Sequence, residues 1–135
     1  RDFSFSGLKT SVLRHVTARR GALGLAPGHP LPAHEVADIC ASFQRVVVAT
    51  LLDRLFDTAA AHRARSVGIA GGVSANSRLR AEAAVRAARG GVPVYIPSLA
   101  LATDNAAMIA AAGLRRHRRG AAADWSFNAE ASLAL

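Results

Sequence analysis

The chain has 135 residues, of which 51% are hydrophobic, and its formal net charge is +8. This length and hydrophobic content suffice for one domain with a core and exclude a disordered chain. No apolar run approaches the roughly 20 residues that span a bilayer, and the opening segment lacks the apolar stretch of a signal peptide, so no membrane partner is expected. The chain does not open with Met, which suggests a fragment or a processed piece, and its single cysteine, Cys40, suits a reducing cytoplasm.

The positive charge comes almost entirely from arginine, which accounts for sixteen of the seventeen Lys and Arg residues. Such an excess attracts anionic partners, above all nucleic acid. A GC-rich coding sequence also produces chains rich in Ala and Arg. Charge alone leaves both explanations open.

The first half of the chain predicts a strand and two helices. Phenylalanine and serine alternate over residues 3–6, which is typical of a short half-buried strand, and Ser6 can cap the helix that follows. A loop rich in Gly and Pro covers residues 21–32. Apolar residues then recur with a period near 3.6, which predicts one helix over about residues 33–64 that packs on a sheet. Cys40 lies on its apolar stripe and is expected to be buried.

The second half predicts alternating strands and helices. Residues 66–71 form an uncharged run without alternation, which is typical of a parallel strand buried on both faces. The fold class is therefore α/β, with a small mixed or parallel sheet flanked by helices. Only about three strands are evident, which is few for a self-sufficient sheet and suggests part of a larger protein. The remaining predicted segments are a helix over 74–89, a strand around 92–96, a helix over 103–119 and a tail whose Trp125 and Phe127 could dock on the body.

A glycine pair follows the strand over residues 66–71. Gly71 and Gly72 lie where ligands bind in open α/β sheets, at the carboxyl end of a strand, and the free N–H groups of a helix start come next. Asn76 falls in the first turn of that helix, where its amide could both donate to and accept from a ligand. The alternative is a tight turn followed by a solvated asparagine, and spacing alone slightly favours that alternative.

A second polar group starts the last helix. Asp104, within Thr103-Asp104-Asn105, is either a helix cap or a metal ligand, and residue type alone favours the cap. Small residues follow it, so the helix can pack close to the sheet. Asp104 is therefore expected at the same end of the sheet as Gly71 and Gly72.

Three segments together resemble one known family. "DFSFSGLKT", "AGGVSANSRLR" and "ATDNAAMIAAAG" are similar, in this order, to motifs of the TsaD family of tRNA N6-adenosine threonylcarbamoyltransferases. The resemblance implies the ASKHA fold, the fold of actin and the sugar kinases. It also implies that residues 1–135 are the C-terminal portion of a pair of such domains and that the N-terminal half is absent.

The resemblance implies a reaction and a site. Members of the family transfer the threonylcarbamoyl group from threonylcarbamoyl-AMP to N6 of an adenosine next to the anticodon of tRNA, in the cytoplasm and with partner proteins of the same modification complex. Gly71, Gly72 and Asn76 match positions that bind the adenylate. Asp104 matches a ligand of a divalent metal, Fe(2+) by resemblance. The two histidines of the family's H-x-x-x-H metal motif have no counterpart here, so the isolated chain is expected to be inactive.

Two alternatives remain open at this point. The chain could be a noncatalytic fragment that binds a nucleotide or a partner, or it could be another carbamoyltransferase or kinase of the ASKHA fold. The "RRHRR" run, Arg115 to Arg119, suits either a contact with tRNA or a solvated helix end.

Overall fold

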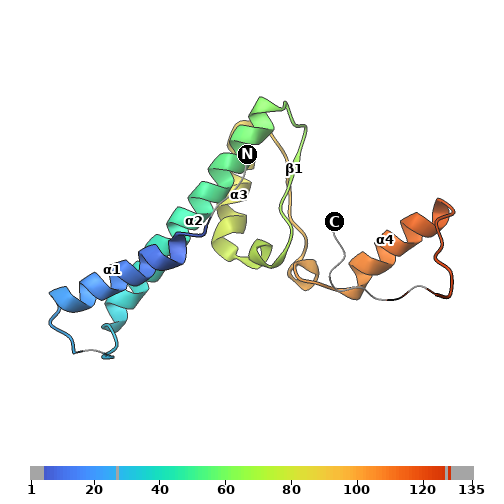
Figure 1. The fold of residues 1–135 in the computed structure, drawn as a ribbon. Coiled ribbons are helices and arrows are strands. Elements are labelled where there is room, and N and C mark those ends of the chain that lie inside the picture. The colour runs from blue at the N-terminus through green and yellow to red at the C-terminus, as the bar shows by residue number, and fades with distance from the viewer. Residues whose placement is uncertain (1–4, 27, 127, 129–135) are drawn as a thin grey trace.

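The computed structural model describes residues 5–26, 28–126 and 128 (Figure 1). Helix α1 lies beside the first half of α2, α3 lies beside the second half, and α4 extends away from all three. In chain order the elements are α1 (Leu8–Ala22), α2 (Ala33–Ala61), β1 (Val67–Gly68), the 3-10 helix η1 (Gly72–Ala75), α3 (Ser77–Gly90), β2 (Val94–Tyr95), the 3-10 helix η2 (Leu99–Leu101) and α4 (Ala106–Arg118).

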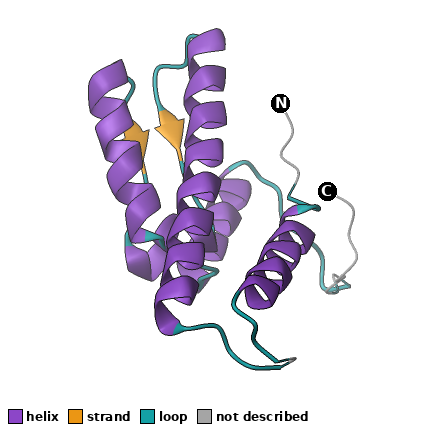
Figure 2. Ribbon diagram, turned by 90° about the vertical axis from the view of Figure 1, so that its left-hand side faces the viewer, coloured by secondary structure: helices purple, strands orange, loops and turns teal. Residues whose placement is uncertain are grey.

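Strands β1 and β2 form a parallel pair, with Val67 opposite Val94 and Gly68 opposite Tyr95. Helix α3 makes the crossover between them, as parallel strands require. Helices α2 and α3 lie on the same side of the two strands (Figures 1 and 2). The predicted α/β class with a small parallel sheet flanked by helices is therefore confirmed for the described residues.

The core lies between α2, α3 and the strands. Val48 and Leu52 of α2 pack with Leu79 and Ala83 of α3, and all four are buried. The residues that are partly buried against this cluster are Leu55, Phe56, Ile69, Val94 and Ile96. The predicted long helix over 33–64 is confirmed as α2, which ends at Ala61. The apolar stripe of its second half packs against α3 and β1.

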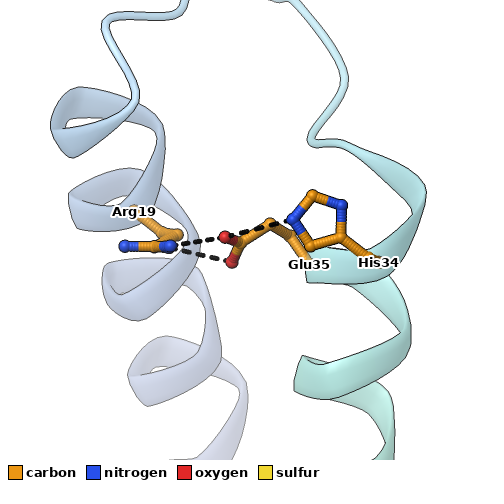
Figure 3. Close-up of polar contacts among 3 residues, drawn as sticks. All are labelled: Arg19, His34 and Glu35. Carbon is orange, nitrogen blue, oxygen red and sulfur yellow. Dashed lines mark hydrogen bonds and ion pairs between the residues drawn. The ribbon is translucent and has the colours of Figure 1, made fainter.

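The first half of α2 lies beside α1 and not beside α3. Arg19 of α1 donates from Nε and Nη2 to both carboxylate oxygens of Glu35, at 2.8 and 2.5 Å (Figure 3). His34 Nε2 lies 3.8 Å from the same carboxylate. The hydrogen bond from Arg19 is the main cause that lowers the pKa of Glu35 below its ordinary value. Neither α1 nor α4 has a buried residue, so both lie outside the core.

Several predictions about burial are wrong. The strand over 66–71 is not buried on both faces: Val67 is buried but Gly68 is exposed, because α2 and α3 cover one side only. Cys40 is exposed, since it falls in the half of α2 that the core does not reach. Trp125 is fully exposed and does not dock on the body, while Phe127 lies outside the described residues.

Three predicted helix starts also move. Helix α1 begins at Leu8 with Gly7 rather than Ser6 at its N-cap. Helix α3 begins at Ser77 and α4 at Ala106, each three residues later than expected. Residues 3 and 4 of the predicted strand over 3–6 lie outside the described residues, and Phe5 and Ser6 are not in a strand. Among the described helices, none combines the length and apolar character that a membrane crossing requires.

Candidate functional site

The glycine pair makes the turn that leaves β1. Gly71 has φ 87° and ψ 173°, a conformation that side chains with a Cβ rarely adopt, so glycine is required there. Its carbonyl accepts a 2.9 Å hydrogen bond from the Ser74 N–H, which closes the turn. Gly72 has an ordinary φ, and a Cβ added to either glycine would meet nothing within 4 Å. The backbone of this turn is therefore open to an approaching group.

Asn76 is the N-cap of α3. Its Oδ1 accepts a 3.0 Å hydrogen bond from the Leu79 N–H, and its side chain is half-buried. Neither sequence interpretation included this cap, because the predicted helix began before Asn76 rather than after it. With its oxygen engaged in the cap, the amide offers its N–H groups to a ligand.

An open pocket of about 620 Å³ lies at the carboxyl ends of the two strands. Gly71 and Asp104 both line it, so this carboxylate lies at the same end of the sheet as Gly71. The expectation that the last helix packs close to the sheet is wrong, because no residue of α4 is buried. Gly72 and Asn76 are not among its lining residues. The other residues that line it are Ile69, Ala70, Tyr95, Ile96, Pro97, Leu101, Ala102, Thr103 and Met108.

Asp104 is not the helix cap that its residue type suggested. The N-cap of α4 is Asn105, whose Oδ1 accepts a 3.1 Å hydrogen bond from the Met108 N–H. Asn105 also donates from Nδ2 to the carbonyl of Thr103, at 2.9 Å. The exposed carboxylate of Asp104 is thus not needed to begin the helix. Asparagine is as good a cap as aspartate, so the sequence contained this signal.

Arg80 ties the pocket's loop to the body. It donates from Nη2 to the carbonyl of Pro97, at 2.5 Å, and so joins α3 to the segment that leaves β2. Ala102, which is almost completely buried, fixes the other end of that segment. The sequence pattern gives no signal for this role of Arg80, because the contact joins residues 17 positions apart.

A second, smaller hollow of about 260 Å³ lies behind the glycine turn. Leu52 and Leu55 of α2 line it together with Ser74. Ser74 is fully buried, and within the described structure its Oγ has no hydrogen-bond partner. Apart from this hydroxyl the hollow is apolar, whereas the larger pocket holds a carboxylate.

The pocket provides one candidate metal ligand. Within residues 5–26, 28–126 and 128, no group of three or more His, Cys, Asp or Glu side chains is placed to hold a metal ion. A single exposed carboxylate occupies one coordination position, and divalent cations need several. A metal site that included Asp104 would need further ligands from outside the described residues.

Comparison with known proteins gives one consistent family. Residues 1–111 match the TsaD family, described as tRNA N6-adenosine threonylcarbamoyltransferase. A protein of that name from Anaeromyxobacter dehalogenans is 45% identical over 135 residues, covering 99% of this chain and 38% of the relative. The protein of that name from Symbiobacterium thermophilum is 45% identical and the one from Thermotoga neapolitana 38%, and each is matched over 99% of this chain and 37% of its own length.

The match includes the glycine turn, Asn76 and Asp104, all of which lie within residues 1–111. The chain spans about two fifths of the length of these relatives. Because the family matches residues 1–111 and the Anaeromyxobacter dehalogenans relative is 45% identical over 99% of this chain, the chain belongs to the TsaD family of tRNA N6-adenosine threonylcarbamoyltransferases.

Proposed function

We propose that this chain is the C-terminal portion of a threonylcarbamoyltransferase of the ASKHA fold, and that it acts on tRNA together with a missing N-terminal half. Family membership supports the reaction, and the 38% coverage of the Anaeromyxobacter dehalogenans relative supports the division into two portions. The parallel strand pair with its crossover helix suits the ASKHA fold. The observation that carries the proposal is the pocket in which the turn at Gly71 and the carboxylate of Asp104 meet.

In this proposal the glycine turn binds the adenosine part of threonylcarbamoyl-AMP. A side chain's Cβ would be the first obstacle to a flat base that approaches this turn. Gly71 and Gly72 have no Cβ, so the base can lie against their backbone. Asn76 stands just beyond this turn and donates a hydrogen bond from its amide to the nucleotide, while its oxygen keeps the cap of α3. The substrate is thereby oriented at the carboxyl ends of β1 and β2.

The chemical step joins N6 of the tRNA adenosine to the carbamoyl carbon. The C–N bond forms, the bond from that carbon to the phosphate oxygen breaks, AMP leaves and N6 loses a proton. Asp104 provides one ligand to a divalent cation, iron(II) by family resemblance, whose other ligands come from outside the described residues. When bound, such a cation polarises a carbonyl or holds the adenylate. The contribution of this chain is to bind and orient the adenylate.

The proposed partners follow from the same reaction. They are tRNA, threonylcarbamoyl-AMP and the other proteins of the modification complex, in the cytoplasm. The main alternative is a noncatalytic fragment that keeps nucleotide or partner binding. For the isolated chain this alternative is favoured, because Asp104 is the one carboxylate that lines the pocket among the described residues.

A chimaera tests the proposal. Residues 1–135 replace the matching segment of the Anaeromyxobacter dehalogenans relative, and threonylcarbamoyl transfer to tRNA is measured. The controls are the unaltered relative and the 135-residue chain alone. We expect transfer by the chimaera and none by the chain alone. A folded chimaera that binds threonylcarbamoyl-AMP without transfer would establish the noncatalytic alternative, and full transfer by the chain alone would show that no second portion is needed.

A further inference from the structure

The far end of α4 concentrates positive charge. Arg115, Arg116 and Arg118 lie in its last turn and Arg119 is its C-cap residue. All four side chains are exposed. Together with His117 these arginines form a cluster that we call the α4 basic end. It contributes four of the chain's seventeen Lys and Arg residues within five positions.

Nothing on the helix balances this charge. Helix α4 contains no Asp or Glu, and in the described part of the chain none of its arginines has an ion-pair partner. By contrast, Arg19, Arg78 and Arg86 each pair with a carboxylate. The negative end of a helix dipole amounts to only about half an elementary charge. The total charge of four guanidinium groups is far larger than this partial charge, so the helix dipole alone does not account for them.

The arginines also share one side of the helix. At about 100° per residue, Arg115, Arg118 and Arg119 fall within an arc of about 100°, and Arg116 lies about 60° beyond it. Helix α4 extends away from α2 and α3 (Figure 1). The guanidinium groups can therefore meet an extended anion without hindrance from the body of the protein.

The helix links this end to the pocket. Met108 lines the pocket, and Arg115 and Arg119 follow it by seven and eleven residues. At 1.5 Å per residue they lie about 10 and 17 Å along the axis from Met108. At roughly 3.4 Å per stacked nucleotide, these distances correspond to phosphates about three to five nucleotides from a base held at the pocket.

We infer that the α4 basic end binds the phosphate backbone of the RNA substrate, about three to five nucleotides from its modified adenosine. The inference rests on the proposed function for the identity of the RNA. Guanidinium groups form paired hydrogen bonds with phosphate oxygens, and such contacts position a nucleic acid without reading its sequence. The α4 basic end thus orients the anticodon stem, while the pocket holds the reacting nucleotides.

The test measures binding of a fluorescent anticodon stem-loop RNA to the 135-residue chain, by anisotropy, between about 50 and about 200 mM salt. The test variant replaces Arg115, Arg116, Arg118 and Arg119 with Gln, which keeps helix propensity and removes charge. A matched control replaces four exposed arginines outside α4 with Gln and gives the same net charge of +4, because 8 − 4 = 4. Those control positions are Arg14, Arg45, Arg65 and Arg89.

We expect the α4 variant to lose at least about tenfold in affinity, and its salt dependence to fall by about one unit of log slope for each phosphate contact removed. The control variant should lose much less. Lys at the same four positions should restore most of the salt dependence, which excludes misfolding as the cause. Equal losses in the two Gln variants would make the effect one of bulk charge and overturn the inference, as would unchanged RNA binding by the α4 variant.

A membrane surface is the competing anionic partner. Vesicles containing phosphatidylserine are therefore measured in parallel, and vesicle binding that needs these arginines while RNA binding does not would overturn the inference. Transfer by the chimaera separates the two proposals. If the α4 variant of the chimaera transfers with an unchanged KM for tRNA, the RNA surface is wrong and the function stands. If RNA binding depends on α4 but the unaltered chimaera transfers nothing, the function is wrong and the RNA surface stands.

Discussion

Asn76 and Asp104 are polar residues next to helix starts, so each could serve as a helix cap, as a ligand-binding group or as both. Asn76 caps α3 through its oxygen, whereas Asp104 leaves the cap of α4 to its neighbour Asn105. A substitution at Asn76 therefore has two consequences, and a substitution at Asp104 should have one. This difference makes both roles testable.

Asn76→Ala removes the cap and the proposed ligand contact together. Losing an N-cap asparagine costs about 0.5–2 kcal/mol of stability, so folding is affected, contrary to what a solvated asparagine in the first turn would give. Asn76→Asp keeps an oxygen for the Leu79 N–H and places a negative charge where a helix start favours it. It removes the N–H donors, so in the chimaera it should weaken threonylcarbamoyl-AMP binding by about 1–3 kcal/mol with little loss of stability. Calorimetric titration and thermal unfolding measure the two effects, and unchanged affinity in the Asp variant would leave Asn76 as a cap only.

Asp104→Asn removes one charge from the pocket and leaves the Asn105 cap intact. In the chimaera it should lower metal content and transfer activity, because an amide oxygen attracts a divalent cation far less than a carboxylate does. The melting temperature without metal should stay nearly unchanged. Asn105→Ala is the matched control: it should cost about 0.5–2 kcal/mol of stability and keep the metal. Elemental analysis decides between the roles, and full metal occupancy in the Asp104→Asn variant would remove Asp104 from the site.

At the scale of elements, periodicity predicted more than residue type did. The 3.6-residue period placed α2 within three residues of both ends. The uncharged run over 66–71 contains β1 and the strand expected around 92–96 contains β2, although each observed strand is only two residues long. The starts of α3 and α4 were missed because a 3-10 turn precedes α3 and a loop precedes α4, and hydrophobic spacing does not distinguish such turns from the helices they lead into. Arg80 could not be found from sequence, since its contact with Pro97 exists only once α3 has packed beside β2.

The pairing of α1 with α2 predicts a pH dependence. The Arg19 hydrogen bond lowers the pKa of Glu35, so the contact stabilises the pair above the ordinary glutamate pKa of 4.5 and is lost as the pH falls through the lowered native value. Protonation of the Glu35 carboxyl, followed by NMR, should have its midpoint below 4.5. Arg19→Gln removes the main cause and should raise that midpoint toward the ordinary value. Equal midpoints in the two proteins would mean that the Arg19–Glu35 hydrogen bond does not form in solution.

At the scale of the whole molecule, the sequence composition suggested one domain with a core, and the structure has only a small one. Among the described residues the buried hydrophobic side chains lie mainly in α2 and α3, while large apolar side chains remain exposed on other elements. Hydrophobic content alone does not show how much of it a chain can bury against itself. The exposed residues on α1, α2 and α4 include Leu13, Val36, Phe43, Val46, Met108, Ile109 and Leu114.

This exposure predicts how the 135-residue chain behaves alone. Exposed apolar surface of this kind favours association, so the chain should be marginally stable or should self-associate as its concentration rises. Sedimentation velocity over a range of concentrations measures this, and thermal unfolding measures cooperativity. Val36→Gln, which replaces an exposed apolar side chain of α2, should reduce association, whereas Ala41→Gln, also exposed on α2, removes no large apolar group and should not. A monodisperse monomer with one cooperative unfolding transition would contradict the expectation, because it would show that the chain needs no further segment to cover these helices.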